Sequence, residues 1–195
     1  LKQLLLEFIK GEKDAKNSVL FLIIATLPAV CAGLVLQDTS ESTFTIAIVK
    51  WMFMITGLVV GGTYFFKNQP KREMVLMIAF CIGLAQTFAL LPGISRSGIT
   101  ISVALIMGIQ HQKAAKFAFF MAIPVLLGAG LLQVISFEPQ INFSTTPLIV
   151  GFISSAITGY LVISWLLDVI SRGKFYLFSL YCFVVSFLNK NELLF

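Results

Sequence analysis

The residues best suited to chemistry lie in one short stretch, residues 89–100, which reads ALLPGISRSGIT. Its proline and glycines permit a tight turn, and its hydroxyls and single guanidinium can all donate hydrogen bonds. Donors gathered where a helix begins form a cradle for an oxyanion, and phosphate is the natural occupant of such a cradle. The sequence therefore predicts a phosphate-binding loop with these candidate contacts: Gly93, Ser95, Arg96, Ser97 and Thr100.

This loop interrupts a chain whose composition indicates a membrane protein. Of its 195 residues, 58% are hydrophobic and only 12% are charged, which is about half the charge usual in a soluble domain. The apolar residues also come in runs that are too long for ordinary core helices. We therefore expect residues 1–195 to form a single integral membrane domain that is all-α and polytopic.

Five of the apolar runs are candidate transmembrane helices, at residues 18–36, 43–66, 114–136, 147–170 and 175–188. A further apolar stretch, residues 99–109, has only 11 residues. At about 1.5 Å per residue it cannot cross a hydrocarbon core about 30 Å thick. The section around the phosphate-binding loop therefore needs an arrangement other than a simple span.

The distribution of basic residues predicts that arrangement. Lys and Arg gather in the loops at 67–72, 110–116 and 171–174, whereas the loops at 37–43 and 137–146 contain neither. Every loop obeys the positive-inside rule only if the chain enters the membrane at 73 and returns to the same side by about 111. Residues 74–110 are therefore predicted to form a re-entrant helix–loop–helix with the phosphate-binding loop at its tip.

Within this hairpin, Pro92 and Gly93 are expected to end the first helix. Gly98 is expected to begin the second, which places Thr100 in its first turn. Gln86 carries a polar amide on the first helix, and a buried amide must be hydrogen-bonded. It either braces the loop or contacts the ligand directly, and the sequence does not choose between these roles.

An arginine at membrane depth costs at least about 2.5 kcal/mol on insertion scales and by default indicates a functional site. The alternative is that the glycines and serines serve close helix packing, while Arg96 pairs with a carboxylate or extends to the interface. None of the nine acidic residues sits centrally in an apolar run. We therefore expect a phosphate, or residues outside this chain, to supply the partner of Arg96.

The remaining polar residues indicate ordinary roles. The net charge of +5 is spread over loops between apolar runs, which favours an orientation signal over a nucleic-acid partner. The three cysteines all lie in apolar runs without metal-ligand spacing. His111 is expected in an interfacial loop, and Lys116 is an orientation charge that can also contact a lipid phosphate.

The stretch LLPGISRSGIT resembles the undecaprenyl-diphosphate phosphatases of the bacitracin-resistance type. Their pattern, Pro-Gly-x-Ser-Arg-Ser-Gly-x-Thr, matches at every fixed position. Gln86 precedes it within GLAQTFAL, and the phenylalanine-rich segment AAKFAFFMAIPVLLGAG follows it. The likeness extends from about residue 17 to the C-terminus.

The resemblance implies an enzyme that hydrolyses undecaprenyl diphosphate to undecaprenyl phosphate and phosphate. Such an enzyme recycles the lipid carrier of cell-wall synthesis in the bacterial plasma (inner) membrane. On this interpretation Arg96 and Ser95 are the catalytic residues: Arg96 clamps the diphosphate, while the hydroxyls of Ser95, Ser97 and Thr100 bind and orient it. The family also implies a divalent cation, magnesium or calcium, as cofactor.

The chain departs from the family in one respect. The family has a second motif near its N-terminus, two glutamates followed by Pro-Val-Ser-Ser-Thr-Gly-His, on the other hairpin of an inverted repeat. That motif does not occur here. We therefore expect a fragment that forms the second half of the repeat, has no metal ligands of its own and is inactive alone. Two alternatives stay open: a lipid-carrier flippase of the same architecture, and a purely structural membrane subunit, which would leave Arg96 unexplained. A homodimer is a further possible partner.

Overall fold

A computed structural model describes residues 13–36, 46–135 and 145–188. Within these ranges the chain is helical apart from turns and one isolated bridge. In chain order the helices are α2 (Lys13–Leu36), α3 (Ile46–Gly62), η2 (Thr63–Phe66), α4 (Leu76–Phe88), α5 (Arg96–Ile106), α6 (His111–Ile135), α7 (Thr145–Ser171), η3 (Phe175–Leu177) and α8 (Phe178–Leu188).

The all-α, polytopic membrane prediction is confirmed. Among the described residues, four helices are long and apolar enough to cross a membrane, at Asn17–Val35, Ala47–Phe66, His111–Gln133 and Thr146–Ser171. They correspond to four of the five predicted spans. The fifth corresponds to a shorter apolar helix, Phe175–Leu188.

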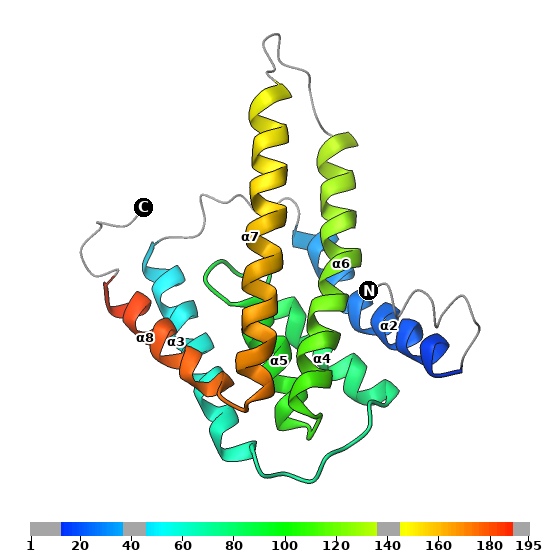
Figure 1. The fold of residues 1–195 in the computed structure, drawn as a ribbon, viewed down its shortest axis with the longest axis vertical. Helices are drawn as coiled ribbons and strands as arrows, with labels where there is room; N and C mark the ends of the chain where they lie inside the picture. Colours follow the sequence, from blue (N-terminus) through cyan, green and yellow to red (C-terminus); the bar gives the residue numbers. More distant parts are fainter. Residues whose placement is uncertain (1–12, 37–45, 136–144, 189–195) are drawn as a thin grey trace.

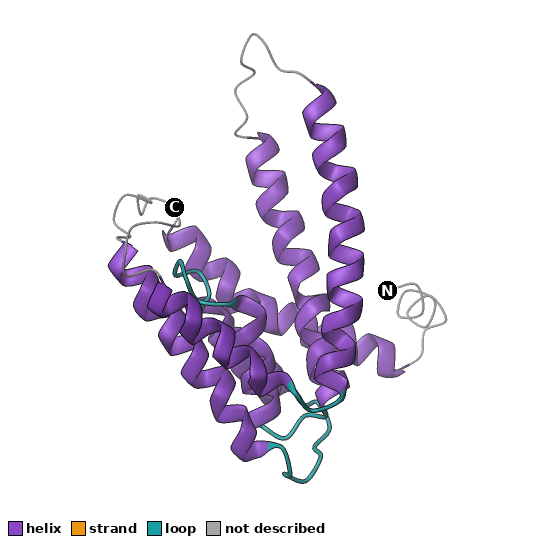
Figure 2. Ribbon diagram, turned by 60° about the vertical axis from the view of Figure 1, so that its left-hand side comes forward, coloured by secondary structure: helices purple, strands orange, loops and turns teal. Residues whose placement is uncertain are grey.

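The helices pack in pairs around the predicted hairpin. α2 packs mainly on α4, and α3 packs mainly on α8, while α5 lies between α3, α4 and α6. α6 and α7 run side by side and extend beyond the other helices at the top of the molecule (Figures 1 and 2). The buried core lies where the hairpin meets its neighbours, and its largest fully buried side chains include Ile82, Ile101 and Met121.

The two ends of the hairpin lie together, as the charge distribution predicts. Arg72 and Ile109 form a parallel bridge, in which the Arg72 N–H donates to the Gly108 carbonyl at 2.9 Å. Glu73, the residue after Arg72, forms an ion pair beside this bridge. Its carboxylate lies 2.9 Å from the Lys113 ammonium. The chain therefore enters and leaves the hairpin at the same end of the molecule, at the bottom in Figure 1. The predicted outer loops, 37–43 and most of 137–146, lie outside the described residues.

The tip of the hairpin reaches well into the depth of the membrane. α4 has 13 residues, which corresponds to about 20 Å of the roughly 30 Å hydrocarbon core. Gly83, in the middle of α4, packs so closely on the backbone of Ala25 in α2 that a β-carbon would collide with it. This contact fixes the middle of α4 against a full-length span, whereas the turn at the tip is only partly covered, with Phe88, Leu90 and Pro92 exposed.

Candidate anion-binding site

Ser95 begins the second helix of the hairpin. It is the N-cap of α5, and its Oγ accepts a hydrogen bond from the Gly98 N–H at 3.1 Å. Serine is among the preferred N-cap residues because its hydroxyl satisfies one of the unpaired N–H groups of the first turn. The prediction that Gly98 begins this helix is wrong, since the capped helix starts at Arg96 and Thr100 therefore falls in its second turn.

Two contacts with α3 fix the loop before this cap. Gly93 has a φ of +92°, and a β-carbon there would lie 2.6 Å from the Val49 carbonyl oxygen. The position therefore requires glycine on two grounds, backbone conformation and space. Two residues later, the Ser95 N–H donates to the Oγ1 of Thr56 at 3.2 Å, and Thr56 is fully buried. The turn is held on α3 by close packing and by one hydrogen bond.

Arg96, the first residue of α5, is held by neutral oxygen atoms. Its Nε donates to Gln86 Oε1 at 2.8 Å, and its Nη2 donates to the Met121 carbonyl at 3.3 Å. The guanidinium is therefore fixed from α4 on one side and from α6 on the other. The expectation that this chain offers Arg96 no partner is wrong, although no described carboxylate pairs with it.

The bonds to Gln86 and Met121 leave much of the guanidinium available. Arginine has five N–H donors, and two of them are used, so three have no acceptor among the described residues. Because Nε and Nη2 carry the internal bonds, both Nη1 hydrogens and one Nη2 hydrogen are unused. A pair of donor nitrogens, Nη1 and Nη2, is therefore left to bind phosphate oxygens.

Gln86 contributes a second unused donor beside this pair. The side chain is 2% exposed, and its Nε2 is buried without a hydrogen-bond partner in the described part of the chain. Because arginine can only donate, the amide oxygen must face Arg96, and the amide nitrogen is free to donate elsewhere. An unpaired buried donor costs about 1–3 kcal/mol, so an acceptor for Nε2 would stabilise the site.

The other predicted contacts lie in the same turn but differ in their hydrogen bonds. Ser97 is half-buried, and its hydroxyl makes no hydrogen bond within the described residues. Thr100 is buried, and its Oγ1 donates to the Arg96 carbonyl at 2.8 Å. A direct bond from Thr100 to a ligand would require that internal bond to be exchanged. The ligand roles of both residues stay predictions.

The arrangement suits an anion and does not suit a metal ion. Arg96, the Gln86 amide and the first N–H groups of α5 are all donors, and a helix N-terminus favours negative charge. Within the described ranges, no group of three or more His, Cys, Asp or Glu residues could hold a metal ion. The divalent cation implied by the resemblance therefore has no donor set beside Arg96 in this part of the chain.

Two contacts at this site were missed by sequence reasoning. Thr56 is a lone hydroxyl residue inside the run MITGLVV, and a buried polar residue in a membrane span must find a partner. For Met121 no such signal exists, because Pro124 leaves the Phe120 carbonyl, and not the Met121 carbonyl, without its helical donor. The Thr56 signal is visible in the sequence but does not name the partner across the fold.

Together, the fold and site define a class: polytopic helical membrane proteins with a re-entrant hairpin that carries an anion-binding arginine at its tip. The family model for bacitracin resistance protein BacA matches residues 1–188. The chain belongs to this family, which confirms the resemblance found from the motif.

Relatives are similar over most of this chain. An undecaprenyl-diphosphatase of Methanothermobacter thermautotrophicus is 33% identical over 171 residues, which are 85% of this chain and 94% of the relative. One of Bacteroides fragilis is 36% identical over 174 residues, 86% of this chain and 65% of the relative. Undecaprenyl-diphosphatase 1 of Halalkalibacterium halodurans is 34% identical over 181 residues, which are 91% of this chain and 66% of the relative. The chain thus spans about two thirds of the last two proteins.

Proposed function

We propose that the protein hydrolyses undecaprenyl diphosphate to undecaprenyl phosphate and phosphate. Membership of the BacA family and relatives named for this activity support the reaction. The observation that carries the proposal is the guanidinium of Arg96, which is fixed by Gln86 and Met121 and keeps three N–H donors unused among the described residues. A fixed fork at the N-terminus of α5 is suited to a diphosphate held at membrane depth.

The described residues perform the binding and charge-neutralising part of this reaction. Phosphoryl transfer requires the attacking and leaving oxygens to be held in line, with the negative charge neutralised. Arg96 and the first turn of α5 neutralise and orient the diphosphate, and the Gln86 Nε2 adds a donor from α4. The Ser95 hydroxyl keeps its hydrogen for donation, since its oxygen acts as acceptor toward Gly98. No described carboxylate contacts this cradle.

The cofactor, location and partners form part of the same proposal. The activity depends on magnesium or calcium, held by residues other than the described ones around Arg96. The protein acts in the plasma membrane on a polyprenyl diphosphate, recycles the lipid carrier of the cell wall, and has no nucleic-acid partner. A homodimer stays an open alternative. Nothing observed in the site favours the flippase interpretation over hydrolysis.

The direct test is Arg96→Lys in the full-length membrane protein. Lysine keeps the charge but loses the planar fork, so we expect phosphate release from undecaprenyl diphosphate to fall by about 100-fold or more. Arg172→Lys is the matched control, because Arg172 pairs with Asp168 on the surface at 2.7 Å, and its activity should be unchanged. Near-normal turnover in Arg96→Lys would show that the planar guanidinium is not required. Absence of turnover by the unmodified protein would contradict the proposed reaction itself.

A further inference from the structure

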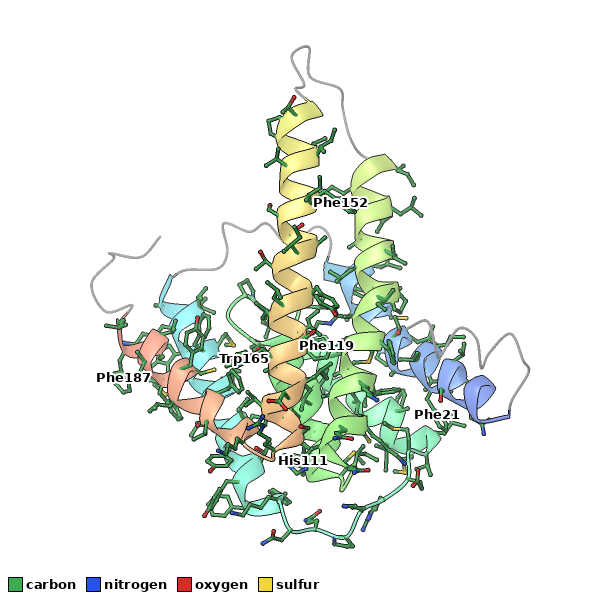
Figure 3. The ribbon with its side chains drawn as sticks, in the orientation of Figure 1. Phe21, His111, Phe119, Phe152, Trp165 and Phe187 are labelled. Carbon is green, nitrogen blue, oxygen red and sulfur yellow. The ribbon has the colours of Figure 1, made fainter. Side chains whose placement is uncertain are left out.

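A second site, with a polar rim and apolar walls, lies beside the start of the hairpin. A cavity of about 600 Å³ opens between the start of α2, the chain at Glu73 and the first turns of α6. None of its lining residues belongs to the tip, although Phe120, on its α6 wall, is next in the chain to Met121, whose carbonyl accepts from Arg96. In Figure 3, Phe21 marks the α2 wall of this cavity, on the side of the molecule away from α3 and α8.

The deeper walls of the cavity are apolar. Phe21 and Leu22 of α2 face Phe117 and Phe120 of α6 across it, and the two phenylalanines of α6 are only partly buried. α2 and α6 are both long apolar helices that could cross the membrane. A groove between two such helices opens to the acyl chains of the bilayer, so its walls favour a hydrocarbon chain over water.

The rim of the cavity is basic. Lys113 and Lys116 both line it, and they lie on α6 within one turn of each other. Lys113 is paired with Glu73, whereas Lys116 is exposed and has no ion pair among the described residues. The cavity therefore presents one unpaired positive charge directly above an apolar groove.

The level of this rim matches the surface of the membrane. It adjoins the bridge between Arg72 and Ile109, where the hairpin enters and leaves. Because the basic loops gather at this end, it is the end that faces the anionic leaflet under the positive-inside rule. A lysine here lies at the depth of lipid phosphates, and the phenylalanines lie at the depth of acyl chains.

We propose that this cavity binds an anionic phospholipid of the bilayer, with its phosphate at Lys116 and Lys113 and an acyl chain between Phe21, Phe117 and Phe120. The charge of the rim selects an anionic head group, and the apolar groove selects a lipid over a free phosphate. The lysine rim of this cavity shares no residue with the Arg96 cradle, and the proposed lipid binding does not depend on the proposed hydrolysis. The bound lipid packs α2 against α6 at the mouth of the hairpin.

The test measures lipid preference at the cavity itself. Trp51→Phe and Trp165→Phe remove the native tryptophans, and Phe120→Trp places one reporter in the groove. Quenching by brominated phosphatidylglycerol is compared with quenching by brominated phosphatidylcholine in bilayers. We expect preferential quenching by phosphatidylglycerol, reduced about fivefold in Lys116→Gln, since one basic residue at a membrane surface contributes about that factor. Lys174→Gln removes an exposed charge at the same end but outside the cavity, and should change nothing.

Each other outcome contradicts the proposal. Equal losses in Lys116→Gln and Lys174→Gln would show diffuse surface attraction only. Relief of quenching by inorganic phosphate would show an anion site without lipid selectivity, and preferential relief by polyprenyl phosphate would make the carrier the occupant. If Phe120→Trp fails to fold, native mass spectrometry of the protein with Phe120 intact, with and without Lys116→Gln, compares the phosphatidylglycerol retained. Equal retention in the two would overturn the site.

Discussion

The hairpin α4–α5 and the pair α6–α7 contrast two ways in which an apolar chain occupies a membrane. Both helices of the hairpin are short, and seven of the 11 residues of α5 are buried. α7 has 27 residues, and no residue of its most apolar stretch, which is 18 residues long, is buried. Its exposed side chains, such as Phe152, project freely from the upper part of the helix (Figure 3). Hydrophobicity alone does not distinguish the two regions.

The difference follows from backbone hydrogen bonding. A continuous helix satisfies its own N–H and C=O groups, so α7 can face lipid on all sides along much of its length. The turn between α4 and α5 cannot, and Thr56 of α3 accepts from one of its N–H groups. Neighbouring helices must therefore supply hydrogen-bond partners to this turn. Polar groups at its tip are positioned by neighbours, whereas polar groups on α7 are satisfied within the helix, as in the bond from Ser164 to the Tyr160 carbonyl.

The largest predicted contrast is between two glycine-to-alanine changes. Gly93→Ala places a β-carbon against the Val49 carbonyl at a positive φ, and the backbone conformation alone costs about 1–2 kcal/mol. Displacement of the adjacent cradle should lower phosphate release about 100-fold. Gly151→Ala on α7 meets nothing within 4 Å and should raise helix stability by about 0.5–1 kcal/mol. Thermal unfolding in detergent measures the stability of both variants, and phosphate release measures their activity. Equal stability and equal activity in the two variants would contradict the predicted difference between the hairpin and α7.

A smaller effect is expected where one amide is removed from each region. Gln86→Leu leaves the Nε donor of Arg96 without its acceptor, and loss of a hydrogen bond to a charged group should lower kcat/KM roughly tenfold or more. Gln133→Leu on the exposed part of α6 should leave kcat/KM unchanged. Steady-state kinetics measure kcat/KM of both variants. An unchanged kcat/KM in Gln86→Leu would mean that Met121 alone fixes the guanidinium of Arg96.

The third contrast concerns two hydroxyl groups and is measured as stability rather than activity. Thr56→Val keeps the shape of a buried side chain but leaves the Ser95 N–H unpaired, which should cost about 1–3 kcal/mol of stability. Ser164→Ala removes an exposed hydroxyl on α7 and should change stability by no more than about 0.5 kcal/mol. The two midpoints of unfolding provide the comparison. A Thr56→Val midpoint within error of the unmodified protein would show that the turn does not need α3.

The sequence predicted the elements better than the contacts between them. Apolar run length located the four long helices, and loop charge located the hairpin over 74–110, since both signals are local and additive along the chain. The start of α5 was misplaced at Gly98 because glycine was given more weight than the N-cap preference of Ser95. Gln86 was predicted either to brace the loop or to contact the ligand, but its bond to Arg96 was not predictable, nor was that of Met121, because the two residues lie 10 and 25 residues away and meet Arg96 only in the fold.

The bridge between Arg72 and Ile109 has a consequence for how the hairpin is made. Since both ends stay at one surface, the basic residues beside them, Lys71 and Lys113, never have to be translocated across the bilayer. Only the tip must be pushed inward, and Arg96 carries the one positive charge between Arg72 and Lys113. Both helices of the hairpin can therefore enter the membrane from one side as a unit, with a single charged side chain carried inward at the tip.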